Sequence, residues 1–181
     1  MLYNSILTKK YFSYLVFPIV IFIYSILINK FSGNNGVVPV DSFSHFDTSA
    51  LVLKNIYPVR DYWMNTGFLI NFIQAFFFNL FGLNWQSYIL HASLFNALIA
   101  LITYFFFTNL QIKRHYSFFY AICFATLFYP TAGTPSVYFH SSMFSLISIY
   151  SFILCYLNKS NLLAFLTPIF VIIGFLCAQV P

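Results

Sequence analysis

Residues 86–110 read QSYILHASLFNALIALITYFFFTNL and contain no charged side chain. An apolar run of more than about 18 residues is long enough to cross a lipid bilayer as one helix. The whole chain has the same character, because 61% of its 181 residues are hydrophobic and only 6% are charged. Soluble domains carry about 25% charged residues. The sequence therefore predicts an integral membrane protein, with the lipid bilayer as its first partner.

Further apolar runs flank this segment, at residues 11–28, 67–81, 117–130, 138–157 and 162–180. Whether residues 67–81 cross the membrane is the question that decides the topology. At about 1.5 Å per residue they reach roughly 22 Å as a helix, which is less than the ~30 Å of a hydrocarbon core. Residues 117–130 are equally short, so length alone does not separate the two runs.

The basic residues favour an arrangement in which residues 67–81 do not cross. With the N-terminus inside, that arrangement leaves five of the eight basic residues in the cytoplasm, namely Lys9, Lys10, Lys113, Arg114 and Lys159. If residues 67–81 did cross, only Lys9 and Lys10 would stay inside, against the usual excess of Lys and Arg in cytoplasmic loops. We therefore expect residues 67–81 to lie at the outer interface as a juxtamembrane helix.

The predicted fold class is all-α. Residues 1–181 are expected to form a single membrane domain, a polytopic transmembrane helix bundle with about five spans. An outer juxtamembrane helical loop covers residues 29–85, and the N-terminus is cytoplasmic. The net charge of +5 comes from dispersed Lys and Arg, without the basic runs of about 5–8 residues that indicate nucleic-acid binding, so no nucleic-acid partner is predicted.

All three carboxylates of the chain, Asp41, Asp47 and Asp61, fall in this outer loop, and the sequence contains no Glu. Acids that served only solubility would be scattered over the chain. Their concentration in one loop outside the membrane indicates a functional site there. Asp41 can act as a general base for an incoming hydroxyl or amine, or it can cap a helix N-terminus. Asp47 is either a second catalytic acid or a solvated one.

Two stripes of side chains indicate a helix in the first part of this loop. The apolar stripe recurs at offsets of 3, 7 and 10, at Phe43, Phe46, Ala50 and Leu53. The polar stripe recurs at offsets of 4 and 7, at Asp41, His45 and Thr48. Asp47 lies about 240° around the helix from Asp41, so the two acids are not expected to form one carboxylate pair.

Other polar residues are candidates for substrate binding. His45 is either a site residue or an interfacial histidine. Arg60 and Asp61 follow a Tyr-Pro turn signal and either bind substrate or form an exposed local ion pair. Tyr138 and His140 lie on another outer connection, where they either border a substrate cleft or belong to an interfacial belt. His91, inside a span, lines a cleft or serves helix packing.

The stretch DSFSHFDTSALVLKNIYPVRDYWMNTG, residues 41–67, resembles the first outer loop of GT-C membrane glycosyltransferases. This group contains the protein O-mannosyltransferases and the lipid A aminoarabinose transferase. In it, an acid soon after the first transmembrane helix opens a juxtamembrane helix, and a G-x-x-P-Y-R-D turn follows. The corresponding turn here is NIYPVRD, residues 55–61, followed by an apolar run from Gly67 to a Phe-Gly pair at residues 81–82.

The resemblance implies an inverting transfer of a sugar from a polyprenyl-phosphate donor to an acceptor on the outer face, with Asp41 as the base and Asp47 in reserve. The implied location is an integral protein of a bacterial inner membrane. No cofactor is implied. A divalent metal binds Asp-x-Asp members of the group, but Ser42 follows Asp41 here, so no metal is predicted.

Members of the group have eight or more spans, whereas five are expected here. The chain is therefore predicted to be the N-terminal portion of such an enzyme, completed by further membrane helices or subunits. Two alternatives remain open: a non-catalytic membrane subunit, and a component of a lipid or sugar transporter. Whether the chain is itself an enzyme is left open by the sequence.

Overall fold

The computed structural model describes residues 2–36, 39–64 and 66–178, with side chains described for residues 15–36, 41–64 and 66–178. The prediction of an all-α fold is confirmed. The helices are α1 (Leu2–Asn35), α2 (Pro39–Leu53), α3 (Leu69–Phe81), α4 (Trp85–Asn109), α5 (Arg114–Leu127), the 3₁₀ turn η1 (Tyr129–Thr131), α6 (Val137–Asn158) and α7 (Asn161–Cys177).

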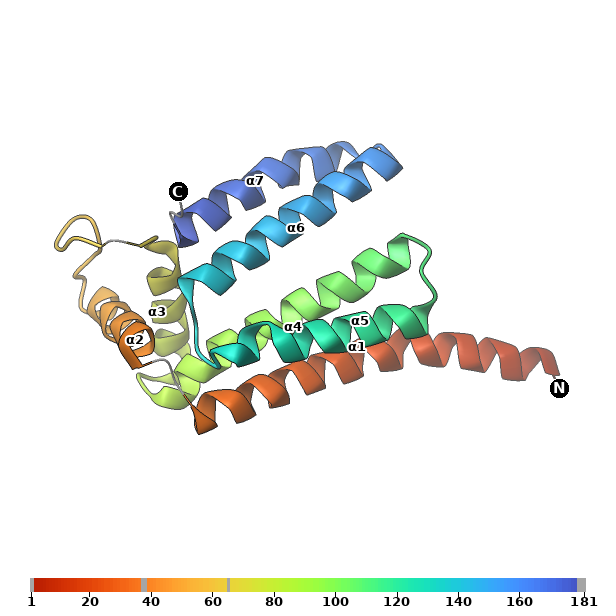
Figure 1. The fold of residues 1–181 in the computed structure, drawn as a ribbon, viewed down its shortest axis with the longest axis horizontal. Coiled ribbons are helices and arrows are strands. Elements are labelled where there is room, and N and C mark those ends of the chain that lie inside the picture. The colour runs from red at the N-terminus through yellow and green to blue at the C-terminus, as the bar shows by residue number, and fades with distance from the viewer. Residues whose placement is uncertain (1, 37–38, 65, 179–181) are drawn as a thin grey trace.

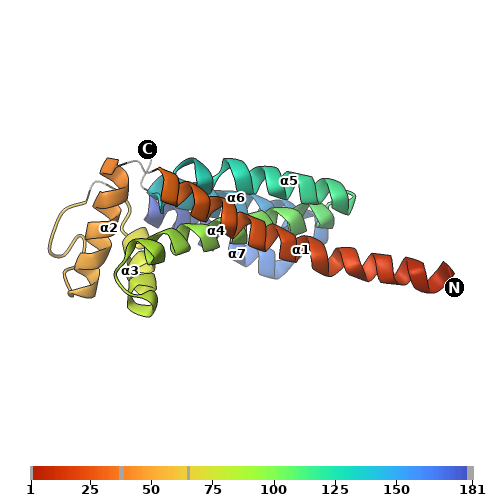
Figure 2. The same cartoon turned by 90° about the horizontal axis from the view of Figure 1, so that it is seen from below.

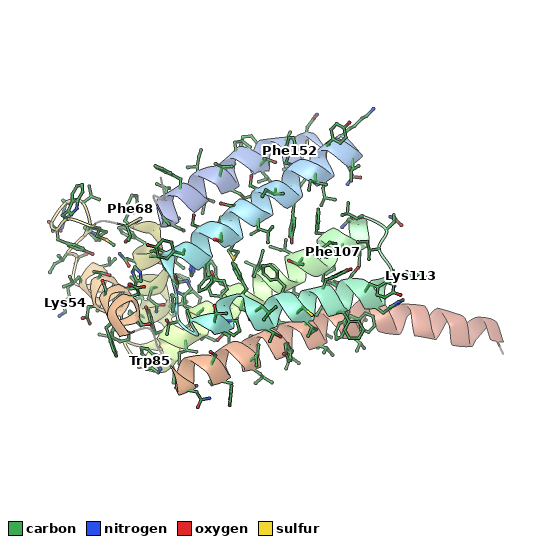
Figure 3. The ribbon with its side chains drawn as sticks, in the orientation of Figure 1. Lys54, Phe68, Trp85, Phe107, Lys113 and Phe152 are labelled. Atoms are coloured by element: carbon green, nitrogen blue, oxygen red, sulfur yellow. The ribbon has the colours of Figure 1, made fainter. Side chains whose placement is uncertain are left out.

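Five helices, α1, α4, α5, α6 and α7, run along the long axis of the molecule (Figure 1). The two remaining helices, α2 and α3, lie across one end of this bundle, as both views show (Figures 1 and 2). This is the arrangement that the sequence predicts, with five aligned helices and a separate helical loop between the first and the second. Lys54 lies at the end that carries α2, and Lys113 lies toward the opposite end (Figure 3).

Three of the aligned helices are long and apolar enough to cross a membrane, at Leu15–Asn35, Trp85–Asn109 and Val137–Asn158. The other two are shorter. Helix α5 has 14 residues and α7 has 17; at about 1.5 Å per residue these helices span roughly 21 Å and 26 Å, below the ~30 Å of a hydrocarbon core.

Small residues hold the middle of the bundle together. Ala100 of α4 and Ala121 and Ala125 of α5 are fully buried beside Ile21 of α1. Residues without long side chains let helix backbones approach closely, which is how membrane helices pack. Asn96 adds a polar link, because its Nδ2 donates to the Ser25 carbonyl of α1 at 3.1 Å and to the Ala125 carbonyl of α5 at 2.9 Å.

Two glycines fix how the connections sit against the bundle. Gly133 has a φ of 70°, and a Cβ there would lie 2.6 Å from the backbone of Gly33 near the end of α1. Asn29 of α1 also donates to the Gly133 carbonyl at 3.3 Å and to Ser93 Oγ of α4 at 3.0 Å. Gly67 lies against the last residues of α7, where a Cβ would overlap the backbone of Leu176 and Cys177.

Helices α2 and α3 bury several uncharged polar side chains and expose several apolar ones. On α2, Ser42, His45 and Ser49 are buried, whereas Phe43 of the apolar stripe is 52% exposed and Leu53 is 39% exposed. On α3, Asn71 and Gln74 are buried while the exposed side is apolar, at Phe72, Phe76, Leu80 and Phe81. Outward apolar side chains at the end of a membrane bundle suit an interfacial position.

The interpretation of Asp41 as a helix N-cap is wrong. Helix α2 begins at Pro39, so Asp41 lies inside its first turn. Proline is favoured at the first position of a helix because its fixed φ suits the helix and its missing N–H would have no partner there. A carboxylate in the first turn still interacts favourably with the positive end of the helix dipole.

Candidate functional site

A buried row of polar side chains lies where α3, α4 and α6 meet. His91 of α4 and His140 of α6 face each other, with their Nε2 atoms 2.9 Å apart. His91 Nδ1 lies 2.7 Å from Oε1 of Gln74 on α3, and His140 Nδ1 lies 2.9 Å from the backbone carbonyl of Ser136. Both histidines are fully buried and Gln74 is 1% exposed. The row therefore forms a continuous hydrogen-bonded chain closed off from solvent.

Aromatic rings enclose this pair. Phe77 of α3 stacks on the His91 ring with centroids 4.9 Å apart. Phe95 of α4 lies 4.8 Å from His91 and 4.6 Å from His140. Tyr129 of η1 meets the His140 ring edge to face at 5.4 Å. The pair thus sits among π-faces rather than among aliphatic side chains.

His45 of α2 is the next member of this polar region. It is 7% exposed, and its Nδ1 has no hydrogen-bond partner among the described residues. Burial lowers the pKa of His45 below its usual value, and this effect is opposed by the charge of Asp41 and by the Asn71 side chain. His45 in turn acts electrostatically on His140. It is therefore coupled electrostatically both to His140 of the buried pair and to the carboxylate of Asp41.

Asn71 connects α2 to α3 in the same region. Its Oδ1 accepts from Thr48 Oγ1 at 3.2 Å, and its Nδ2 lies 3.1 Å from Met64 Sδ. The neighbouring Tyr88 of α4 donates its hydroxyl proton to the Ser42 carbonyl of α2 at 2.8 Å. These bonds tie the polar stripe of α2 to the bundle.

The two acids of α2 are solvent-accessible. Asp41 and Asp47 are exposed, and in the described part of the chain neither carboxylate makes a side-chain hydrogen bond or an ion pair. Phe43, two residues after Asp41, lines an open recess of about 320 Å³ together with Trp85, Asn34 and Asn35. The acids are thus free to react with a group that approaches this end of the molecule.

Arg60 and Asp61 lie away from the buried pair, in a turn whose polar groups hydrogen-bond to one another. The Arg60 guanidinium is 2.6 Å from Asp61 Oδ2, and the same oxygen accepts from the Tyr57 backbone N–H at 2.7 Å. Both bonds, that to Arg60 first, lower the pKa of the Asp61 carboxyl. Arg60 also lies 4.5 Å from the centroid of the Tyr57 ring. Each polar group that was a candidate for binding substrate here has a local partner.

Tyr138 and His140, two residues apart, have opposite surroundings. Tyr138 is 56% exposed, whereas His140 is fully buried in the histidine pair. Of the candidate site residues, the structure groups His45 with His140 and places Asp41 close enough to act on His45. It does not bring Tyr138 or the pair Arg60–Asp61 into this group.

Gln74 and Asn71 are site residues that the sequence interpretation did not single out. Their signal is visible in hindsight, because they are two amides three positions apart in the stretch LINFIQAFFFNLF, whose only other polar residue is the exposed Asn79. Buried amides at a spacing of three residues share one helix face. Among the described residues, no group of three or more His, Cys, Asp or Glu side chains is arranged to hold a metal ion.

The chain has no match among protein-family models, curated proteins or solved structures.

Proposed function

We propose that the chain is the membrane domain of a GT-C-type glycosyltransferase that takes a sugar from a polyprenyl-phosphate donor at the outer face. The observation that carries the proposal is Asp41, an exposed carboxylate without a partner among the described residues, in the first turn of a helix that lies across the end of the bundle. The resemblance of residues 41–67 to the acidic loop of that group supports the same residue as the base.

In the proposed reaction, Asp41 takes the proton of an acceptor hydroxyl or amine as that group attacks the anomeric carbon of the donor sugar. The new bond to this carbon forms as the bond to the phosphate oxygen breaks, and polyprenyl phosphate leaves with the electron pair. A positioned general base of this kind contributes about 10²–10⁴-fold to a rate. Asp47, on the same helix, is the reserve base.

The outward apolar side chains of α2 and α3 support the placement of this site beside the membrane. Phe43 and Phe76 are more than half exposed, which suits contact with lipid at the interface. The recess lined by Phe43, Trp85, Asn34 and Asn35 has aromatic and amide groups, and a mostly apolar recess with a few polar groups is the usual setting for a small ligand. A sugar carried on a lipid tail would reach it from the bilayer.

The test is sugar transfer by the full gene product in native membranes or proteoliposomes, with a polyprenyl-phosphate sugar as donor. Asp41→Asn should reduce the rate at least 100-fold, with the protein still folded and membrane-inserted. Ser44→Ala, at another exposed position of the same helix, is the control and should retain most of the activity. Full transfer by Asp41→Asn would overturn the assignment of the base. The same preparation shows whether additional membrane helices or subunits copurify with the chain.

A second candidate, a component of a lipid or sugar transporter, is favoured by one observation. Ionisable groups buried inside membrane bundles mark proton pathways in pumps and transporters, and His91 and His140 are such a pair. Under this alternative, Asp41→Asn leaves function intact and substitution of the histidines abolishes it.

A further inference from the structure

The hydrogen bonds of the His91–His140 pair restrict where its protons lie. A backbone carbonyl only accepts, so His140 Nδ1, 2.9 Å from the Ser136 carbonyl, must carry a proton. The remaining nitrogen of this ring, Nε2, faces Nε2 of His91 at 2.9 Å. One of these two Nε2 atoms must donate and the other must accept.

The orientation of the Gln74 amide determines how many protons this hydrogen-bonded chain holds. Where its Oε1 faces His91 Nδ1 at 2.7 Å, that nitrogen must carry a proton, because the amide oxygen only accepts. His140 then carries a proton on Nδ1 and His91 carries one on its own Nδ1. A hydrogen bond between the two Nε2 atoms needs a third proton. Two neutral imidazoles supply two protons, so this arrangement holds one proton more and a charge of +1.

The neutral pair requires the opposite orientation of the amide. If Gln74 turns its Nε2 toward His91, it donates to His91 Nδ1, and His91 Nε2–H then donates to His140 Nε2. In the structure, where Gln74 Oε1 faces His91, Gln74 Nε2 is buried without a partner. In the reversed orientation Oε1 would be the unpaired atom. Each orientation leaves one of these two amide atoms without a hydrogen bond, at a comparable free-energy cost. The orientation of the amide therefore depends on which histidine nitrogens carry protons.

We propose that His91 and His140 form a proton-binding site, in which one proton is shared between the two Nε2 atoms and the Gln74 amide turns over when it binds. The ligand is a single proton. Gln74 is a positioning residue that accepts from His91 in the loaded state and donates to it in the empty state.

The aromatic rings around the pair suit the loaded state. A cation within about 6 Å of a ring centroid is attracted by the π-face, and Phe77 and Phe95 both lie within 5 Å of a histidine ring. Ionisable groups on the neighbouring elements are few. They are His45 on α2, which acts on His140, and Tyr129 on η1 with Cys177 of α7 beside it. Helix α3 has no ionisable residue.

His45 gives the site a connection to the outside. It is within electrostatic reach of both His140 and the exposed Asp41, and its Nδ1 is unpartnered among the described residues. A positive charge on the pair therefore acts on His45, and a charge on His45 acts on the pair. This site does not depend on the proposed transferase activity, because the proton is bound whether or not a sugar is transferred.

The test is nitrogen-15 NMR of the full chain, labelled at histidine, in detergent micelles or lipid nanodiscs as the pH is lowered. Nitrogen-15 spectra separate protonated from unprotonated ring nitrogens. We expect His140 Nδ1 to be protonated throughout, His91 Nδ1 to become protonated on acidification, and both rings to change at one midpoint with uptake of one proton. Two independent uptake steps, an unprotonated His140 Nδ1, or no uptake before the fold is lost would each overturn the proposal.

A substitution at Gln74 tests the role of its amide. Gln74→Glu places a permanent acceptor beside His91 and should raise the midpoint of proton uptake by about one to three pH units, the effect of an opposite charge at contact distance. Gln111→Glu adds the same charge at an exposed turn between α4 and α5 and is the matched control, with an unchanged midpoint. Equal shifts in both variants, or none in Gln74→Glu, would overturn the role of Gln74. If Gln74→Glu does not fold, Gln74→Met removes the acceptor and should lower the midpoint.

Discussion

The middle of the bundle and its α2–α3 end differ in what they bury. In the middle, Ala100, Ala121 and Ile21 are buried between α1, α4 and α5. At the end, His45 and Gln74 are buried while several apolar side chains of α2 and α3 are exposed. The first region packs over small residues, and the second buries imidazole and amide groups and exposes apolar side chains.

This difference follows from the free energy of moving apolar and polar side chains from lipid into the protein interior. An apolar side chain gains little by leaving lipid for the protein interior, because lipid tails are as apolar as leucine. A polar side chain gains much more, since in lipid it would have no hydrogen-bond partner. Helices α2 and α3 accordingly bury His45, Asn71 and Gln74, whereas Phe43 and Phe76 are more than half exposed. The contrast predicts different sensitivities for the two regions.

The largest effect is expected at Gly67, which lies just before α3 and contacts the last residues of α7. Gly67→Ala would place a Cβ into the backbone of Leu176 and Cys177, and neither backbone can move without shifting α7. We expect a loss of about 3 kcal/mol in the free energy of unfolding, the upper part of the range for overpacking. Chemical denaturation in mild detergent measures it. Gly36→Ala, where nothing lies within 4 Å of the added Cβ, is the control and should change stability little.

A smaller effect is expected in the middle of the bundle, at Asn96. Asn96→Leu keeps the volume approximately but removes the donor to the Ser25 and Ala125 carbonyls. Polar links between membrane helices contribute about 0.6–1.7 kcal/mol, so we expect a loss of about 1 kcal/mol in the same denaturation experiment. A loss as large as that of Gly67→Ala would show that this polar link matters as much as the close backbone contact at Gly67, and would contradict the expected order.

The third prediction concerns the pH dependence of stability and His45 at the α2–α3 end. Burial holds the pKa of His45 below its usual 6.5, so the unfolded chain binds a proton on this side chain at a higher pH than the folded chain. The contribution of neutral His45 to the free energy of unfolding is therefore complete above about pH 6.5, and it is lost as the pH falls toward the pKa of His45 in the folded chain. His45→Gln should weaken this dependence in thermal unfolding scans between about pH 8 and pH 5. The exposed His115 is the control, and His115→Gln should leave the dependence in place.

The smallest effect is expected at Asp61, in the turn between α2 and α3. Its partners are Arg60 and the Tyr57 N–H, all local and exposed, and exposed ion pairs add little to global stability. Asp61→Asn should leave the unfolding midpoint unchanged while faster limited proteolysis reports a loosened turn at residues 55–62. A lowered unfolding midpoint would mean that this turn is coupled to the polar end after all.

Much of the architecture could be predicted from the sequence, and the reason differs from one element to the next. The five aligned helices follow from apolar runs such as residues 86–110, and the separate position of residues 67–81 follows from where Lys113 and Lys159 fall. The N-cap interpretation of Asp41 failed because the helix begins two residues earlier, at Pro39. Gln74 was overlooked because an amide in an apolar helix gives no indication of its partner.

The sequence by itself determined that this is a membrane protein and that its acids are concentrated in residues 41–61, because hydropathy and charge are local properties of the chain. Only the tertiary structure decided that α2 buries His45 while leaving Asp41 exposed, and that His91 and His140 meet across 2.9 Å although 49 positions separate them in the chain. Those outcomes depend on the rotation and depth of each helix against its neighbours. Helix rotation is set by close contacts such as those of Gly67 and Gly133, which no single segment encodes.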